Sequence, residues 1–175
     1  AQAEHDERSQ SILITDSQDF SSKVLSSIEK FMRKIPKQEI IKKSLDNFGI
    51  VVILDDLNKA PEIIDIIAPE HLHLQNESSN FIFNKIQNAG GIFLGEYSSE
   101  AFGDYIVGTN HILPTSGSAK FSSALGVLDF MKRSSYVEMS ENNAYELEEF
   151  VSKMAAIENL NGHKLSVKIR QKQKK

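Results

Sequence analysis

The chain of 175 residues carries a net charge of −4, has a pI near 5.8 and contains no cysteine. Without cysteine there is no disulfide framework and no thiolate chemistry, and the acidic balance gives no reason to expect a nucleic-acid partner. No apolar run is long enough to span a membrane and no signal peptide is apparent, so we expect a cytoplasmic protein that does not engage membranes.

The chain opens with a polar, helix-forming stretch, residues 1–8, that has no N-terminal capping residue. We interpret it as the end of a helix whose upstream part is absent. From residue 12 to residue 94, short apolar runs alternate with amphipathic segments, which predicts strands and helices in turn. The expected strands are residues 12–15, 49–54, 71–75 and 92–94, and the expected helices are residues 18–35, 40–45, 57–68 and 78–89.

This alternation predicts an α/β fold with a mostly parallel sheet and flanking helices, in which ligands bind beyond the carboxyl ends of the strands. Residues 101–115 directly follow the fourth expected strand and contain Gly103, Gly108 and Pro114, so we expect a loop. Because the loop also presents Asp104 and His111, it is a candidate site. The alternative is a structural turn with a polar surface.

The character of the sequence changes after residue 116. Residues 141–160 form an amphipathic pattern that predicts a long helix, and residues 163–175 predict another. We expect two parts: a partial α/β domain carrying the site loop over residues 1–116, and a connecting segment with a helical dimerisation arm over residues 117–175. The lysine-rich end of the chain is most simply a solvated helix end.

Two groups of residues are chemically suggestive before any family is considered. Gln2 and His5 are spaced to share a helix face, and with Asp104 and His163 they could form a mixed nitrogen and oxygen Zn²⁺ site. Glu70 and His71 place a carboxylate beside an imidazole, which suits general acid–base chemistry. Alternatively, the histidines bind no metal and the Glu-His pair is an exposed acid beside a strand end.

The order and surroundings of these residues resemble the C-terminal part of histidinol dehydrogenase. The motifs that carry the resemblance are Gln2-Ala-Glu-His5, Ala68-Pro-Glu-His-Leu72, Asn88-Ala-Gly90, Ile92-Phe-Leu-Gly95, Glu100-Ala101, Gly103-Asp-Tyr105, Gly108-Thr-Asn-His111, Leu113-Pro-Thr115, Phe121-Ser-Ser123, Asp129-Phe130 and the stretch from Glu158 to Lys164. The Gly-Asp-Tyr to Leu-Pro-Thr segment is the most specific of them.

The resemblance implies an incomplete Rossmann-like domain and an oxidoreductase that converts L-histidinol to L-histidine in two NAD-linked steps, the end of histidine biosynthesis. It assigns Glu70 as the acid that activates water and His71 as the general base, with substrate contacts from His71, Asp104, His111, Glu158 and His163. It assigns one zinc ion to Gln2, His5, Asp104 and His163. It also implies a homodimer in which His163 reaches across to the other subunit.

The sequence departs from the family pattern in two ways. The N-terminal half, which carries the NAD-binding domain, has no counterpart, and no Gly-x-Gly-x-x-Gly fingerprint occurs. Ala124 and His73 stand where glycine and an acidic residue are expected. We therefore expect the chain alone to be inactive, either as a portion that works with a separate N-terminal half or as a truncated copy. The alternative is a non-catalytic relic or module that binds zinc and an imidazole ligand or only dimerises.

Overall fold

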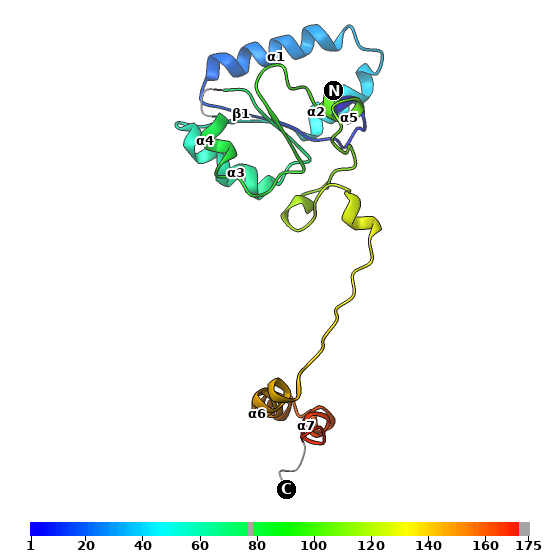
Figure 1. Ribbon diagram of the computed structural model, residues 1–175. Coiled ribbons are helices and arrows are strands. Elements are labelled where there is room, and N and C mark those ends of the chain that lie inside the picture. The colour runs from blue at the N-terminus through cyan, green and yellow to red at the C-terminus, as the bar shows by residue number, and fades with distance from the viewer. Residues whose placement is uncertain (77–78, 172–175) are drawn as a thin grey trace. The chain divides into compact units, whose positions relative to one another are not determined.

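The computed structural model describes residues 1–76 and 79–171, which divide into two compact units (Figure 1). The first unit is Ala1–Phe130 and the second is Met131–Lys175. Ser78, expected at the start of a helix, and residues 172–175 of the lysine-rich end lie outside the described residues.

The first unit is built on two pairs of parallel strands. β1 (Ser11–Thr15) pairs with β2 (Gly49–Ile53), and β3 (His71–Leu74) pairs with β4 (Gly91–Leu94). Parallel neighbours need a crossover connection, which the intervening helices provide. The α/β prediction is confirmed, with one difference: the four described strands form two separate pairs and not one continuous sheet.

Helices follow the strands in the expected order. They are α1 (Gln18–Met32), α2 (Gln38–Phe48), α3 (Ala60–Ile67), α4 (Ser79–Phe83) and α5 (Glu100–Tyr105), with 3₁₀ turns η1 (Gln2–Glu4), η2 (Leu57–Lys59), η3 (Ser118–Lys120) and η4 (Val127–Phe130). The Ser17 hydroxyl caps α1 by accepting from the Phe20 N–H at 3.1 Å. No helix in the described ranges is long and apolar enough to cross a membrane.

The core of this unit lies where both strand pairs meet α3 and α4. Its buried members are Ala60, Ile64, Leu74 and Ile82, with Ile14, Leu54, Leu72 and Ile86 packed against them. Side chains alternate across a strand, so Leu72 and Leu74 of β3 face this core while His71 and His73 face away from it. The face of β3 with Leu72 and Leu74 therefore packs in the core, and the face with His71 and His73 is left for other contacts.

Three expected boundaries are wrong. Residues 1–8 form only the η1 turn, whose N-cap residue makes no side-chain hydrogen bond that could start a longer helix. α4 ends at Phe83 and not at residue 89. The segment 101–115 is not a loop throughout, because α5 occupies its first residues.

The second unit is a helical hairpin of α6 (Glu141–Ile157) and α7 (Asn161–Lys168), which confirms the predicted helical arm. The Ser140 hydroxyl accepts from the Asn143 N–H and caps α6. The Leu160 N–H donates to the Ala155 carbonyl at 2.7 Å and Asn159 has a φ of 58°, which turns the chain between the helices. α7 already begins at Asn161, where we expected a break.

Candidate functional site

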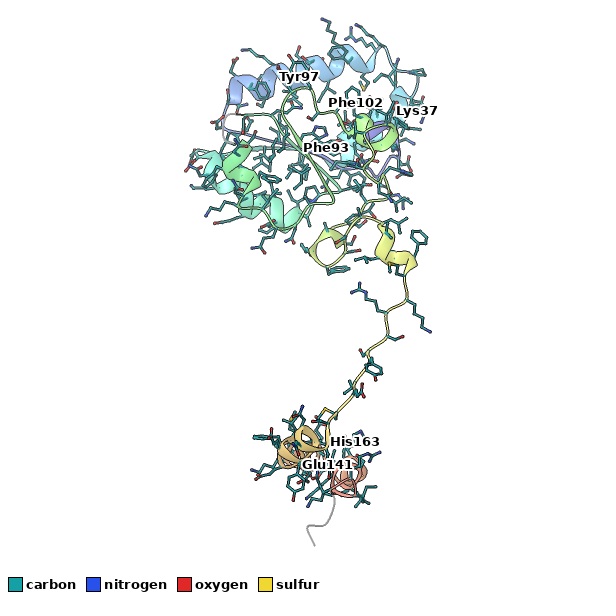
Figure 2. The ribbon with its side chains drawn as sticks, in the orientation of Figure 1. Lys37, Phe93, Tyr97, Phe102, Glu141 and His163 are labelled. Atoms are coloured by element: carbon teal, nitrogen blue, oxygen red, sulfur yellow. The ribbon has the colours of Figure 1, made fainter. Side chains whose placement is uncertain are left out.

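The site of the first unit is centred on the face of β3 that carries His71 and His73. Phe93 of β4 lies directly opposite His73 in the strand register. The His73 and Phe93 rings are stacked with centroids 5.0 Å apart, and the His71 and Phe93 rings are tilted with centroids 5.9 Å apart. The Phe93 ring, inside the N-terminal unit in Figure 2, therefore contacts both imidazoles.

Backbone geometry fixes Glu70 just ahead of the strand. The Gly91 N–H donates to the Glu70 carbonyl at 2.7 Å, and a Cβ atom on Gly90 would lie 2.6 Å from that same oxygen. Only glycine at position 90 allows this approach. Two residues before Glu70, the fully buried Ala68 adopts a left-handed conformation with φ 49°. The backbone that leads into Glu70 and His71 is thus a constrained turn.

α5 covers the same face of β3. Gly103, the fourth residue of α5, lies so near Phe93 that a Cβ atom there would be 2.9 Å from the ring. The Thr109 hydroxyl donates to the Gly103 carbonyl at 3.0 Å and ties the following loop to the helix. Asp104, next to Gly103, is thereby brought to His71.

His71 lies between two carboxylates. Its Nδ1 is 4.0 Å from Glu70 Oε2, and its Nε2 is 3.9 Å from Asp104 Oδ1. The His71 side chain is only 14% exposed, and its Nε2 is buried without a hydrogen-bond partner among the described residues. Buried polar atoms are nearly always paired, so this imidazole nitrogen has a free position for a water molecule or a ligand.

A second imidazole–carboxylate pair lies beside the first. His73 Nε2 is 3.2 Å from Glu100 Oε2 at the start of α5. Burial raises the pKa of Glu100, but its own backbone N–H, the His73 charge, the Ser99 hydroxyl and the Ala1 amino group together lower that pKa below its ordinary value. Glu100 is therefore held in its charged form.

The remaining candidate of the loop, His111, is exposed on the segment after α5. The neighbouring Asn110 fixes this segment, because its amide donates to the Leu125 carbonyl at 2.8 Å and its oxygen accepts from the Ile112 N–H at 2.8 Å. The backbone around His111 is thus ordered, while its imidazole is free to meet a ligand.

The two N-terminal metal candidates lie near α5. Gln2 belongs to η1 and His5 follows it, and Lys37 (labelled in Figure 2) donates to the Glu4 carbonyl at 3.5 Å, which ties η1 to α2. The Ala1 amino group makes the smallest contribution to the lowered pKa of Glu100, and Figure 1 draws the N-terminus beside α5. Within residues 1–76 and 79–171, however, no three His, Asp or Glu side chains converge into a metal-binding group.

Glu158 and His163 belong to the second unit. Glu158 ends α6, and His163 is an exposed residue of α7 on the helical hairpin (Figure 2). Both side chains are thus accessible to a ligand or another chain. Of the predicted site residues, the structure brings Glu70, His71 and Asp104 together.

From the sequence we did not identify His73, Phe93 and Glu100 as site residues, although we noted His73 as a departure from the family pattern and Phe93 and Glu100 within motifs. A pattern was present: two histidines two residues apart on a strand share a face, and two carboxylates four residues apart on a helix do so as well. Because we expected a loop over residues 101–115, we did not consider that Glu100 and Asp104 lie about one helical turn apart.

Comparison with known proteins gives a consistent result. The sequence matches the family model of histidinol dehydrogenase over residues 1–171. It is 44% identical over 172 residues to the histidinol dehydrogenase of Hydrogenovibrio crunogenus, covering 98% of this chain and 40% of that protein. It is also 44% identical over 170 residues to that of Clostridium acetobutylicum, covering 97% of this chain and 39% of that protein.

A solved structure agrees with these matches. The crystal structure of histidinol dehydrogenase from Elizabethkingia anophelis superposes with a TM-score of 0.86 at 34% identity, covering 97% of this chain and 39% of that one. The chain thus spans about 40% of the length of the curated relatives it matches.

Proposed function

The chain belongs to the histidinol dehydrogenase family, and from this premise we propose that it supplies the proton-transfer residues and zinc ligands for the NAD-linked oxidation of L-histidinol to L-histidine. One observation carries the proposal. The His71 ring lies between two carboxylates, with Nδ1 towards Glu70 and the buried Nε2 towards Asp104, which suits a general base beside a second acid–base group.

In the proposed first step, His71 Nε2 accepts the hydroxyl proton of the alcohol, and the same carbon would lose its hydride to bound NAD, which leaves the aldehyde. His71 then releases its proton to solvent. In the second step, Glu70 takes a proton from water as the water oxygen bonds to the aldehyde carbon, which forms a diolate. His71 accepts the remaining hydroxyl proton of the diolate, and loss of a second hydride to bound NAD would give the carboxylate. General base help of this kind contributes ~10²- to 10⁴-fold.

We place the NAD site outside this chain. The sequence has no glycine-rich dinucleotide fingerprint, and the other part of the family's length is where we place the nicotinamide. The protein's share of hydride chemistry is the positioning of the cofactor against the substrate. We therefore propose that the chain works only when an N-terminal half, on the same or a separate polypeptide, is assembled with it.

We also propose that Gln2, His5, Asp104 and His163 hold one zinc ion. The donor set of imidazole nitrogen, carboxylate and amide oxygen suits zinc, with Gln2 in η1, His5 directly after it and Asp104 in α5. When bound, the ion would hold the imidazole and amino nitrogens of the substrate. His111 and Glu158 would add contacts to the same substrate.

The fourth ligand, His163, would come from the partner subunit of a homodimer. The supporting observation is the apolar surface of α6, where Phe150 and Met154 are each 64% exposed and Ile157 is 82% exposed. Such side chains on one helix favour burial against another chain. Light scattering of the purified chain should show a dimer at micromolar concentration, and a monomer throughout would contradict this part of the proposal.

The second candidate function is a non-catalytic module that binds zinc or only dimerises. The observation that favours it is the coverage, because about 60% of each relative has no counterpart in this chain and that part would carry the NAD site. Binding of NAD, measured by calorimetry on the chain mixed with an N-terminal half, separates the two functions. The enzyme predicts binding that depends on both parts, and the module predicts no more binding than the N-terminal half shows by itself.

The deciding experiment is complementation. The 175-residue chain is mixed with the N-terminal portion of the Hydrogenovibrio crunogenus relative that it lacks, and NADH absorbance is followed with histidinol. We expect no turnover by either chain alone and turnover by the mixture. Turnover by the isolated chain would contradict the proposal that NAD binds to the N-terminal half. A mixture that assembles but remains inactive would favour the non-catalytic module.

A further inference from the structure

One face of α5 matches one face of the β3–β4 pair residue by residue. Glu100, Gly103 and Asp104 are spaced to share that face of the helix. They meet His73 at 3.2 Å, the Phe93 ring at 2.9 Å from an ideal Cβ position, and His71 at 3.9 Å. The contact between His71 and Asp104 is therefore one of three contacts made by a single docked helix.

α5 cannot hold this position by its own helical stability. It has six residues, and Ser99 at its N-cap makes no side-chain hydrogen bond to the helix backbone. Helices this short are not stable in isolation, so tertiary contacts must keep α5 folded and in place. Gly103 itself adds no apolar side chain to the contact, which leaves the polar residues on either side of it to supply attraction.

The contact between His73 and Glu100 is well suited to that task. The two side chains are 31% and 20% exposed, so they are better shielded from water than the exposed pair of Lys43 and Glu7, at 63% and 58%. Exposed ion pairs contribute little, whereas shielded, charge-assisted contacts contribute more. The stack of His73 on Phe93 restricts the imidazole to the position that faces Glu100.

We propose that His73 and Glu100 are positioning residues: their contact docks α5 onto the β3–β4 pair and so sets the place of Asp104 relative to His71. Neither residue has to touch the substrate. The use of this contact in catalysis rests on the proposed function, but the contact itself does not, because it is made within one unit of the chain. An experiment can therefore disprove the docking role of this contact without disproving the proposed function, and the reverse also holds.

The test is nuclear magnetic resonance on the full chain, with Gly103 as the reporter. An α-proton of Gly103 points at the Phe93 ring, so docking gives a ring-current shift and a cross-relaxation peak between the two residues. We expect Glu100→Gln to lose most of both. His73→Phe, which keeps an aromatic ring for Phe93 but not the ion pair, should lose them as well, and the double variant should be no worse than either single variant.

Glu7→Gln is the matched control, because it breaks an ion pair of similar length, 3.1 Å, on the exposed surface. It should leave the Gly103 signals unchanged. The methyl signals of Ile82, buried in the core, report whether each variant is folded. If Glu100→Gln does not fold, His73→Phe decides. Wild-type Gly103 signals in either folded variant, or fully additive losses in the double variant, would overturn the proposal.

Discussion

Gly103 and Phe93 are in such close contact that any side chain at position 103 would collide with the ring: an ideal Cβ atom would lie 2.9 Å from Phe93 Cε1 and 3.2 Å from Cζ. In most helices a glycine is unfavourable, and alanine improves stability by about 0.5–1 kcal/mol. Here the ring cannot easily yield, since it is stacked on His73 and contacts His71.

Gly103→Ala should therefore destabilise the chain, by about 1–3 kcal/mol as in other overpacked sites. Gly162→Ala is the matched control, because Gly162 is also helical and a Cβ atom there meets nothing within 4 Å. It should be neutral or stabilising by about 0.5–1 kcal/mol. Urea unfolding followed by circular dichroism measures both, and equal effects of the two substitutions would contradict the assigned collision.

The buried left-handed turn at Ala68 gives the second prediction. Ala68→Val places a branched side chain at φ 49° in a position with no exposed surface. Steric strain and overpacking should together cost about 2–4 kcal/mol. Ala68→Gly relieves the strain but loosens the unfolded chain, so its effect should stay within about 1 kcal/mol. Thermal unfolding of both variants tests this, and a tolerated valine would show that the turn is not constrained.

When the chain is assembled with an N-terminal half, substitutions of Glu70 and His71 should slow different oxidation steps. His71→Asn removes the proton acceptor used in both oxidations and should slow each by ~10²-fold or more. Glu70→Gln should slow oxidation of the aldehyde, which needs water activation, far more than oxidation of the alcohol. Single-turnover kinetics started from histidinol and from the aldehyde distinguish these effects, and identical profiles for the two variants would argue against separate roles.

The lowered pKa of Glu100 predicts that the stability of the fold depends on pH. Its pKa is lowered in the folded chain from an ordinary value of 4.5, so its charged form stabilises the fold. This contribution is fully present above pH 4.5 and disappears as the pH falls through the lowered pKa. Glu100→Gln should therefore be less stable than the wild type at pH 7, and the difference should shrink on acidification below pH 4.5. Urea midpoints from pH 3 to pH 7 measure it, and a constant difference would contradict the pKa assignment.

Zinc affinity tests the proposed ligand set. Because no three His, Asp or Glu side chains of the described residues are arranged to hold a metal ion, we expect the chain alone to bind Zn²⁺ weakly. Asp104→Asn should weaken binding further by ~10-fold or more, whereas Asp46→Asn, on the exposed face of α2, should not. Titration against a chromophoric chelator gives both affinities. Tight binding that is insensitive to Asp104→Asn would show that the ion lies elsewhere.

The order of elements was predictable because it depends on local patterns. The strands were placed to within a residue or two from apolar runs, and Ser17 marked the start of α1. Glu70 and His71 were found because they are adjacent in sequence. α5 was missed because Gly103 argues against a helix locally, and the reason for a glycine there is the Phe93 ring, which is distant in sequence.

The pairing of His73 with Glu100 could not be predicted for the same reason. Neither residue's own segment indicates a partner for it, and only the docking of α5 brings them to 3.2 Å. The split of the strands into two pairs was also not predictable, since strand patterns do not say which neighbours hydrogen-bond. Local sequence thus specified the elements and the adjacent residues of the site, and tertiary contacts specified the rest.

The alternation along β3 has a consequence for how this protein can change over time. Leu72 and Leu74 face the core while His71 and His73 face α5, so insertion or deletion of one residue in this strand would exchange the two sets. Imidazoles would then enter the core and leucines would face the carboxylates. Folding and the placement of the imidazoles would fail in the same event, so a single-residue insertion or deletion in β3 cannot leave a folded chain that has lost only the arrangement of its histidines.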